Sequence, residues 1–266
     1  MLTIGAEGYR IVKKQNVLFH GIVDYEKAQR QHGGVVKAIG AIQIPSFGLP
    51  DEVFVANTAL PLPMLPPTFI MANFKYAQRK QESDNLAPYL SKIGKVIQWP
   101  YNSVLEGQGE TKWFHGGKIV VVGYGFRSSK QSVSDLEEIL NKIYKSHGLT
   151  PPIVLGVKLL DARYYHMDIA SHAISSTECL IHSGAISNQD IQKMEGHGIR
   201  CIVRSFGDPF ALNCVMVNGK HYTHVLTAKA RAVMKSVGLK VVELDVSEFE
   251  KSGGALRCMV LCLFHI

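Results

Sequence analysis

The sequence predicts an α/β fold in which five similar units close around a shared centre. Two observations carry this prediction: one order of elements recurs five times along the 266 residues, and a polar residue recurs at the same point of each unit. Each unit is a helical pattern that ends at glycine, an apolar strand, and then the polar residue. One unit cannot bury its apolar face alone, so closure of the ring would bring the five polar residues inward.

Length and composition agree with such a fold. With 46% hydrophobic residues, the chain can bury one sizeable core, and we expect one domain over residues 1–266. Its longest apolar run, from Met259 to Phe264, is much shorter than the roughly 18 residues that indicate a membrane span. The first residues, MLTIGAEGYR, lack the basic and apolar regions of a secretion signal. We therefore expect a cytoplasmic protein without a membrane partner.

The formal net charge of +7 raises the question of an anionic partner. Lysine and arginine come at most as short pairs, such as Lys13-Lys14 and Arg79-Lys80, and no basic run alternates with aromatic residues. A diffuse positive balance of this kind is typical of a solvated surface. We therefore expect no nucleic-acid partner.

The five predicted helices share apolar positions at helical spacing and a glycine after the last turn. They are residues Tyr25 to Ile39 before Gly40, Glu82 to Ile93 before Gly94, Ser134 to Ser146 before Gly148, Ser187 to Glu195 before Gly196 and Gly198, and Thr227 to Val237 before Gly238. The helix from Ser134 is the best defined, because Glu137 stands at capping-box spacing from that serine.

An apolar strand follows each helix, and one polar residue follows each strand. The strands are AIQIP, VIQW, IVLGVKLL, IRCIVRSF and KVVELDV in chain order, and the polar residues are Asn57, Glu106, His166, Asn213 and Cys258. A second strand-like run comes next: TALPL, KIVVVGYG, IASHAI, CVMVNG and MVLCLF. Gly116-Gly117 and Asn218-Gly219 mark hairpin reversals. Strand ends often carry a polar residue, but cysteine, histidine and glutamate at one recurring position favour a functional centre.

The five cysteines are odd in number and show neither a CxxC pair nor the spacing of a metal site. They therefore predict no disulfide framework, no metal, and a reducing compartment in which a thiolate nucleophile can persist. Cys258 follows Ser252-Gly253-Gly254, where glycine permits a close backbone approach to a ligand. Cys262, four residues later in an apolar run, is expected to be a core residue.

These motifs resemble the pentein superfamily of guanidino-group-modifying enzymes, which includes arginine dihydrolases, dimethylarginine dimethylaminohydrolases and amidinotransferases. SEFEKSGGALRC is similar to the segment that ends on the family's nucleophile, and YYHMD to its His-x-Asp element. EGQGE is similar to its EGGGD element, with Glu110 in place of the aspartate, and VFVANTAL and RKQE match two substrate-side elements. The resemblance covers nearly all of the chain after about residue 40. It implies a five-bladed α/β propeller with pseudo-fivefold symmetry.

The resemblance also implies roles for three catalytic residues. Cys258 would be the nucleophile, His166 the general acid and base, and Glu106 the carboxylate that orients His166. A thiolate suits attack on a resonance-stabilised guanidinium carbon, and a histidine can protonate the departing amine and later activate water. No metal or organic cofactor is needed.

Four further residues would bind the substrate. Asp168 would hold the guanidinium nitrogens, Arg79 a substrate carboxylate, and Gly254 would allow close approach. Asn57 stands where many deiminases carry aspartate, whereas branches that resemble arginine dihydrolase carry asparagine. The segment NVLFHGIVDYEKAQRQH does not reproduce the family's substrate lid with its asparagine.

The resulting prediction is a cysteine hydrolase of guanidino C–N bonds that acts through a covalent thiouronium intermediate. Arginine is the first expected substrate, giving citrulline or ornithine plus ammonia, and methylated arginine is the second. Two alternatives stay open: an amidinotransferase with the same nucleophile, and a non-catalytic binding or effector protein on the same fold. The sequence does not predict an oligomeric state.

Overall fold

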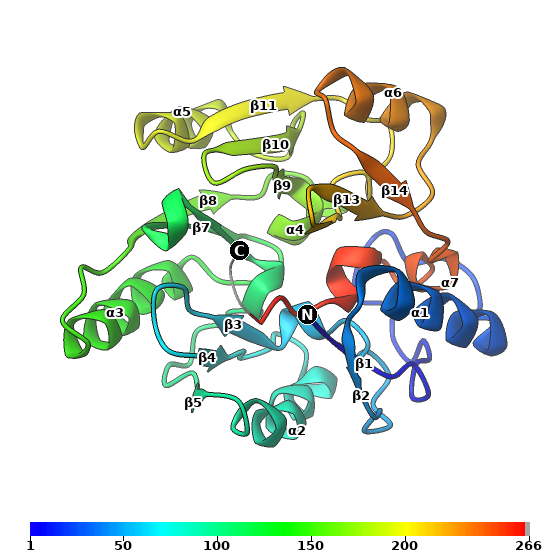
Figure 1. The fold of residues 1–266 in the computed structure, drawn as a ribbon, viewed down its shortest axis with the longest axis horizontal. Coiled ribbons are helices and arrows are strands. Elements are labelled where there is room, and N and C mark those ends of the chain that lie inside the picture. Colours follow the sequence, from blue (N-terminus) through cyan, green and yellow to red (C-terminus); the bar gives the residue numbers. More distant parts are fainter. Residues whose placement is uncertain (264–266) are drawn as a thin grey trace.

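The computed structural model describes residues 1–263 and has five small sheets arranged around a central axis, with helices on the outer rim (Figure 1). This is the predicted α/β propeller. Within the described residues, four of the sheets have three strands and one has two. In each three-stranded sheet an antiparallel hairpin is followed by a helix that leads to a parallel third strand.

The helical and strand bounds are as follows. The strands are β1 (Leu2–Ile4), β2 (Ile42–Ile44), β3 (Ala59–Pro61), β4 (Thr68–Met71), β5 (Lys95–Ile97), β6 (Thr111–Phe114), β7 (Ile119–Tyr124), β8 (Ile153–Lys158), β9 (Ser171–Ala173), β10 (Glu178–His182), β11 (Arg200–Arg204), β12 (Val215–Val217), β13 (Lys220–Thr223) and β14 (Val241–Glu243). The α-helices are α1 (Tyr25–Ile39), α2 (Lys80–Leu90), α3 (Gln131–Ser146), α4 (Met167–Ala170), α5 (Asn188–Gly196), α6 (Ala228–Ser236) and α7 (Ser247–Glu250).

The rim helices confirm most of the predicted ends. Helix α1 has the predicted bounds, with the Asp24 side chain accepting from Lys27 N and Gly40 at φ 62°. Helices α5 and α6 begin after Ser187 and Thr227, whose hydroxyls accept backbone N–H groups three residues on. The local capping signals therefore fix where these helices start.

Two predicted helix starts were wrong. Helix α3 begins at Gln131, so Ser134 lies inside it and its hydroxyl donates to the carbonyl of Gln131 instead of capping the helix. Helix α2 runs from Lys80 to Leu90, two residues before its predicted start and three before its predicted end. The chain turns after Leu90 to bring Gly94 against Pro67, where a Cβ atom would lie 2.3 Å from the carbonyl oxygen.

Two of the runs expected directly after the polar residues were also assigned wrongly. Strand β6 follows Glu106, and KIVVVGYG forms β7, the central strand of that sheet. The predicted reversals at Gly116-Gly117 and Asn218-Gly219 are confirmed, since they join β6 to β7 and β12 to β13. In MVLCLF, Leu261 makes only an isolated bridge, and Phe264 lies outside the described residues.

The bridge at Leu261 closes the ring. Leu2 and Leu261 exchange two backbone hydrogen bonds of 2.9 Å, so the last described segment pairs with the first strand. This contact completes the two-stranded sheet β1-β2 on the side where the other sheets have their hairpin strand. Both ends of the described chain therefore belong to one blade.

A buried histidine, His224, links the sheet β12-β13-β14 to Glu250, in the segment before Cys258. His224 Nδ1 lies 2.9 Å from Glu250 Oε1, and His224 Nε2 lies 3.2 Å from Asp208 Oδ1. Burial alone would lower the pKa of His224, but the two carboxylates outweigh it and raise the pKa to about 9. Imidazolium is therefore the form that the folded protein stabilises at neutral pH.

The stability contributed by His224 is expected to depend on pH. Because its folded pKa lies above the ordinary value of 6.5, the contribution is fully present below pH 6.5 and is lost as the pH rises through about 9. Urea unfolding of the wild type and His224→Gln at pH 6 and pH 9.5 measures this directly. The difference in unfolding free energy between the two proteins should shrink by up to about 3 kcal/mol. A difference that does not change with pH would contradict the charged contact.

Candidate active site

The five recurring polar residues lie in the short inner turns of the five blades. Each is at most 3% exposed, and each stands at or beside the turn that opens a blade: Asn57 in Val55–Asn57, Glu106 before Gly107–Gly109, His166 before α4, Asn213 before β12, and Cys258 in Leu256–Met259. The structure therefore brings together residues that are up to 201 positions apart in sequence (258 − 57).

Cys258 is held between a carboxylate and an amide. Its thiol donates to Asp168 Oδ2 at 3.4 Å and accepts from Asn213 Nδ2 at 3.2 Å. Burial raises the pKa of the Cys258 thiol well above its ordinary value, and the nearby charge of Asp168 raises it further. In the free site the sulfur therefore carries a proton at neutral pH.

Asn213 positions the turn that carries the nucleophile. Its side-chain oxygen accepts from the backbone N–H groups of Arg257 at 2.8 Å and Cys258 at 3.3 Å, and its amide also donates to the carbonyl of Asp168 at 3.1 Å. The repeat pattern identified this residue but predicted no role for it. The hydrogen bonds make it a positioning residue for both Cys258 and Asp168.

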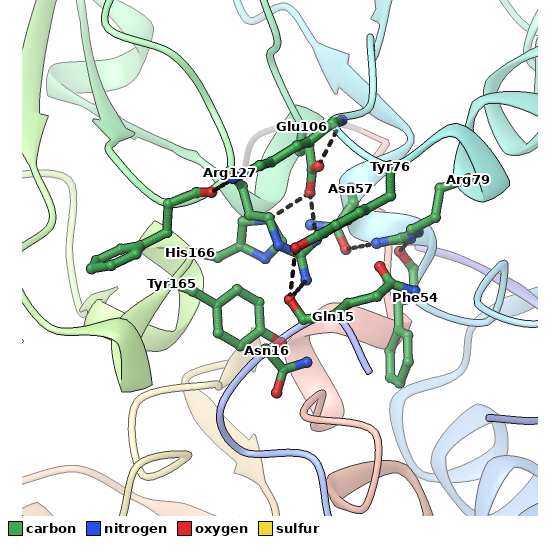
Figure 2. A network of polar contacts seen from close by, with 12 residues as sticks. Gln15, Asn16, Phe54, Asn57, Tyr76, Arg79, Glu106, Arg127, Tyr165 and His166 are labelled. Atoms are coloured by element: carbon green, nitrogen blue, oxygen red, sulfur yellow. Dashed lines mark hydrogen bonds and ion pairs between the residues drawn. The ribbon is translucent and has the colours of Figure 1, made fainter. Parts of the chain in front are cut away.

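His166 is paired with Glu106. His166 Nε2 lies 2.7 Å from Glu106 Oε2, in a contact drawn in Figure 2. Burial opposes ionisation of Glu106, but Arg127 at 3.1 Å and His166 outweigh it, so the pKa of Glu106 lies below its usual range. The ionised carboxylate accepts from Nε2–H, which leaves Nδ1 of His166 as the nitrogen available to reacting atoms.

The protonation state of His166 follows from its surroundings. Burial lowers the pKa of His166, and hydrogen bonding to Glu106 only partly offsets this effect. The imidazole is therefore neutral at rest and becomes the acid only after it has taken up a proton. Such a group can work in both directions during a two-step reaction.

Arg127 is a site residue that the sequence analysis missed. Its guanidinium lies 4.9 Å from the ring centre of Tyr76 and 4.8 Å from that of Tyr165, while Nη1 contacts Glu106 (Figure 2). Nη2 donates to the carbonyl of Gln15 at 3.4 Å. A single arginine in a turn after β7 carries no pattern that distinguishes it from a surface arginine.

Glu110, which replaces the aspartate of the resemblance, connects two inner turns. Its carboxylate accepts from the backbone N–H of Ser128 at 3.1 Å and of Met167 at 3.3 Å, and it is fully buried. Burial raises the pKa of Glu110 well above its usual value, and the charges of Glu106 and Asp168 add to the effect. Glu110 thus fixes the residues that follow Arg127 and His166.

Two buried polar atoms of the predicted substrate-binding residues have no hydrogen-bond partner among the described residues. They are Asp168 Oδ1 and Asn57 Nδ2. Asp168 is fully buried and Asn57 is 2% exposed, and an unpaired buried polar atom is costly. A ligand with donors for the first atom and an acceptor for the second would satisfy both.

Two predicted substrate contacts differ from the expectation. Arg79 lies at the cavity, but its guanidinium already makes a double contact with Glu82, at 2.8 and 2.7 Å. It also donates to Asn57 Oδ1 at 3.4 Å, a contact drawn in Figure 2. Its charge is therefore paired before any carboxylate arrives. Gly254 also lines the cavity, but its close neighbour is the ring of Phe54, which an added Cβ would meet at 2.3 Å.

An extended N-terminal segment covers the cavity. Ile11, Lys13, Gln15 and Asn16 line it together with Cys258, and about 20 Å³ of the cavity remains free. Gln15 Nε2 donates to Asp51 Oδ2 at 2.5 Å, and Asn16 Nδ2 donates to the carbonyl of Ser252 at 2.8 Å. An asparagine, Asn16, therefore lines the cavity.

The part of the chain that the structure describes contains no helix long and apolar enough to cross a membrane. Within residues 1–263, no group of three histidine, cysteine or acidic side chains is placed to hold a metal ion. All five cysteines are free thiols.

A propeller whose inner turns present a thiol, an imidazole and carboxylates is the architecture of the pentein superfamily, as the sequence predicted. Within it, the chain belongs to the family described as N,N dimethylarginine dimethylhydrolase, eukaryotic, which matches residues 25–265. This membership confirms the predicted enzyme class, a hydrolase of guanidino C–N bonds.

Three comparisons illustrate the relationship. The uncharacterized protein ZK1307.1 of Caenorhabditis elegans is 30% identical over 254 residues, which are 91% of this chain and 86% of that protein. The bifunctional arginine dihydrolase/ornithine cyclodeaminase ArgZ of Synechocystis sp. is 28% identical over 222 residues, 82% of this chain but only 30% of that enzyme. The solved N-terminal domain of ArgZ, a cyanobacterial arginine dihydrolase, superposes with a TM-score of 0.85 at 24% identity, covering 99% of this chain and 97% of that domain.

The two cysteines of the C-terminal segment provide a matched test of the nucleophile. Cys258→Ser should lower turnover by at least about 10³-fold, because a serine hydroxyl in this site is a much weaker nucleophile. Cys262→Ser should keep most of the activity. Ammonia and alkylamine release from guanidino compounds gives the rates, and circular dichroism shows whether each variant is folded. Equal losses in two folded variants would mean that Cys258 serves packing instead of chemistry.

Proposed function

We propose that this chain hydrolyses arginine through a covalent intermediate on Cys258 and carries the reaction past citrulline to ornithine. The observation that carries the proposal is a pair of unpartnered buried atoms: Asp168 Oδ1, whose carboxylate contacts the thiol, and Asn57 Nδ2, whose residue lines the same cavity as Cys258. A guanidinium group can donate to the first, and the carbonyl of a ureido group can accept from the second.

Binding of the cation is expected to activate the nucleophile. In the free site, Asp168 accepts a hydrogen bond from the Cys258 thiol. A guanidinium that donates to Asp168 would replace the thiol as the donor to this carboxylate. The same positive charge close to the sulfur lowers the pKa of Cys258, opposite to the effect of burial. Thiolate would therefore form mainly when substrate is present.

The first half-reaction forms a bond from Cys258 sulfur to the guanidinium carbon. Collapse of the adduct breaks one C–N bond, and the proton lost by the thiol leaves with the departing ammonia through His166. The product of this step is a thiouronium on Cys258. Because the nucleophile must be a free thiol, we place the reaction in a reducing compartment such as the cytoplasm.

The second half-reaction hydrolyses the thiouronium. Neutral His166 takes a proton from water, which attacks the carbon and releases citrulline and the Cys258 thiol. Glu106 holds the tautomer of His166 and stabilises the imidazolium that forms, and Arg127 keeps Glu106 ionised. Repetition of the cycle on the ureido group would release a second ammonia and leave a carbamate, which loses carbon dioxide to give ornithine.

The polar end of the substrate would lie under the N-terminal segment. Arg127 and Arg79 line that part of the cavity, and Arg127 donates there only to a backbone carbonyl and to Glu106. A substrate carboxylate fits the Arg127 guanidinium by charge and fork geometry, whereas Arg79, whose charge is paired with Glu82, would contribute less. Since about 20 Å³ is free, the covering segment has to move for arginine to enter.

Asn57 supports a second hydrolysis. An aspartate at this position would add a negative charge that favours the cationic substrate over a neutral ureido group, whereas the amide of Asn57 adds no charge. The dihydrolase ArgZ, which is 28% identical over 82% of this chain, supports the same choice. A methylated arginine is the second candidate substrate, and the match to the dimethylarginine hydrolase family favours it.

Product analysis tests the proposed reaction. Wild-type protein given arginine should release two ammonia per turnover with ornithine, and Asn57→Asp should shift the product toward citrulline. Chromatography of the products, with methylated arginines and an added amine as parallel arms, measures this. Accumulation of citrulline by the wild type, or release of alkylamine only, would contradict the dihydrolase proposal while keeping the thiol mechanism. Amidino transfer to the added amine would indicate a transferase, and no turnover or binding of any guanidino compound would favour an effector protein.

A further inference from the structure

A second cavity lies on the other side of the ring of inner turns. Its volume is about 300 Å³, and it shares no lining residue with the cavity at Cys258. Two neighbouring residues of the turn Leu256–Met259 face different cavities. Cys258 lines the first cavity, whereas Arg257 lines the second. The inner turns therefore separate two sites.

The second cavity contains two buried cations. Lys112 and Arg257 line it, and each side chain belongs to a residue that is 8% exposed. Arg257 donates to the carbonyl of Val260 and, at 2.9 Å, to the side-chain oxygen of Gln108, both of which are uncharged. Among residues 1–263, neither Lys112 nor Arg257 forms an ion pair, because no carboxylate oxygen lies within 4.0 Å of its charged group. Within the same residues, Lys112 Nζ makes no hydrogen bond.

Two histidines add to the same surface. His172, which lines the cavity, lies with Nε2 2.8 Å from Nδ1 of His221, and both are buried. Burial lowers the pKa of His172 well below its ordinary value, and His221, Lys112 and Arg257 lower it further. Burial also lowers the pKa of His221, so the pair is uncharged at neutral pH.

The uncompensated charge is costly. Burial, with the charge of Arg257, lowers the pKa of Lys112 to about 8, so the ammonium form still dominates at pH 7. The charge of Asp168 offsets only part of this effect, and removing two cations from water without an ion-pair partner opposes folding. An anion in the cavity would neutralise both charges and restore the pKa of Lys112 toward its ordinary value.

We propose that this second cavity binds a small multivalent oxyanion, of the phosphate or polycarboxylate class. Arg257 supplies a fork that matches either group, and Lys112 supplies a point charge. The volume of about 300 Å³ is at the lower end of the range for ligand pockets, which suits a compact anion. The site is distinct from the catalytic cavity and does not depend on the proposed reaction.

Calorimetric titration with inorganic phosphate and with citrate tests this site. Wild-type protein should bind at least one of them saturably, and Lys112→Met should bind it at least tenfold more weakly. Lys95→Met is the matched control, because Lys95 is an exposed strand lysine that lines neither cavity, and it should bind like the wild type. Arg127→Gln, which alters the catalytic cavity, should also retain binding. The better probe indicates which oxyanion class the cavity prefers.

Thermal unfolding gives a second readout. In anion-free buffer Lys112→Met should unfold at a higher temperature than the wild type, because it removes an unpaired buried charge. The bound anion should raise the unfolding temperature of the wild type but not of this variant. Lys112→Gln keeps a polar group and serves if the methionine variant does not fold. Failure of both anions to bind, equal affinity in the Lys112 variants, or loss of binding in Arg127→Gln would overturn the proposal.

Discussion

The contact between the Cys258 thiol and the buried carboxylate of Asp168 is the interaction on which the site depends. It keeps the sulfur protonated in the free protein, because burial and the carboxylate both raise the pKa of the thiol. The same carboxylate has a second oxygen without a partner among the described residues. A cation is the ligand that satisfies this oxygen and favours thiolate at the same time. In the first half-reaction, reactivity is therefore coupled to the charge of the guanidinium substrate.

That contact exists only because the ring closes. Asp168 and Cys258 come from different blades, and Asn213 from a third turn holds both of them. The backbone pairing of Leu2 with Leu261 fixes the last described segment, which carries the nucleophile a few residues earlier. The segment around Gln15 then covers the cavity. Loss of either end of the chain should therefore disturb chemistry as well as stability.

Much of this fold could be predicted from the sequence, because the residues that begin and end the helices act locally. The caps Asp24, Ser187 and Thr227 and the glycines after the helices define the repeat, and the repeat located the five inner residues. The pairing of Arg79 with Glu82, three residues on, and the role of Arg127 were not predicted, because a sequence does not show which charged side chains become buried. Strand β6 was missed because the more apolar β7 run gave the stronger signal. The catalytic roles themselves stay predictions.

The central claim is that Cys258 forms a covalent bond to the substrate carbon. Acid quenching of wild-type protein during turnover of arginine, followed by mass spectrometry of the peptide that contains Cys258, tests it most directly. We predict an added mass equal to arginine less one ammonia on Cys258, and on none of the other four cysteines. Turnover with an unmodified Cys258 peptide at every quench time, or the same mass on another cysteine, would contradict the account.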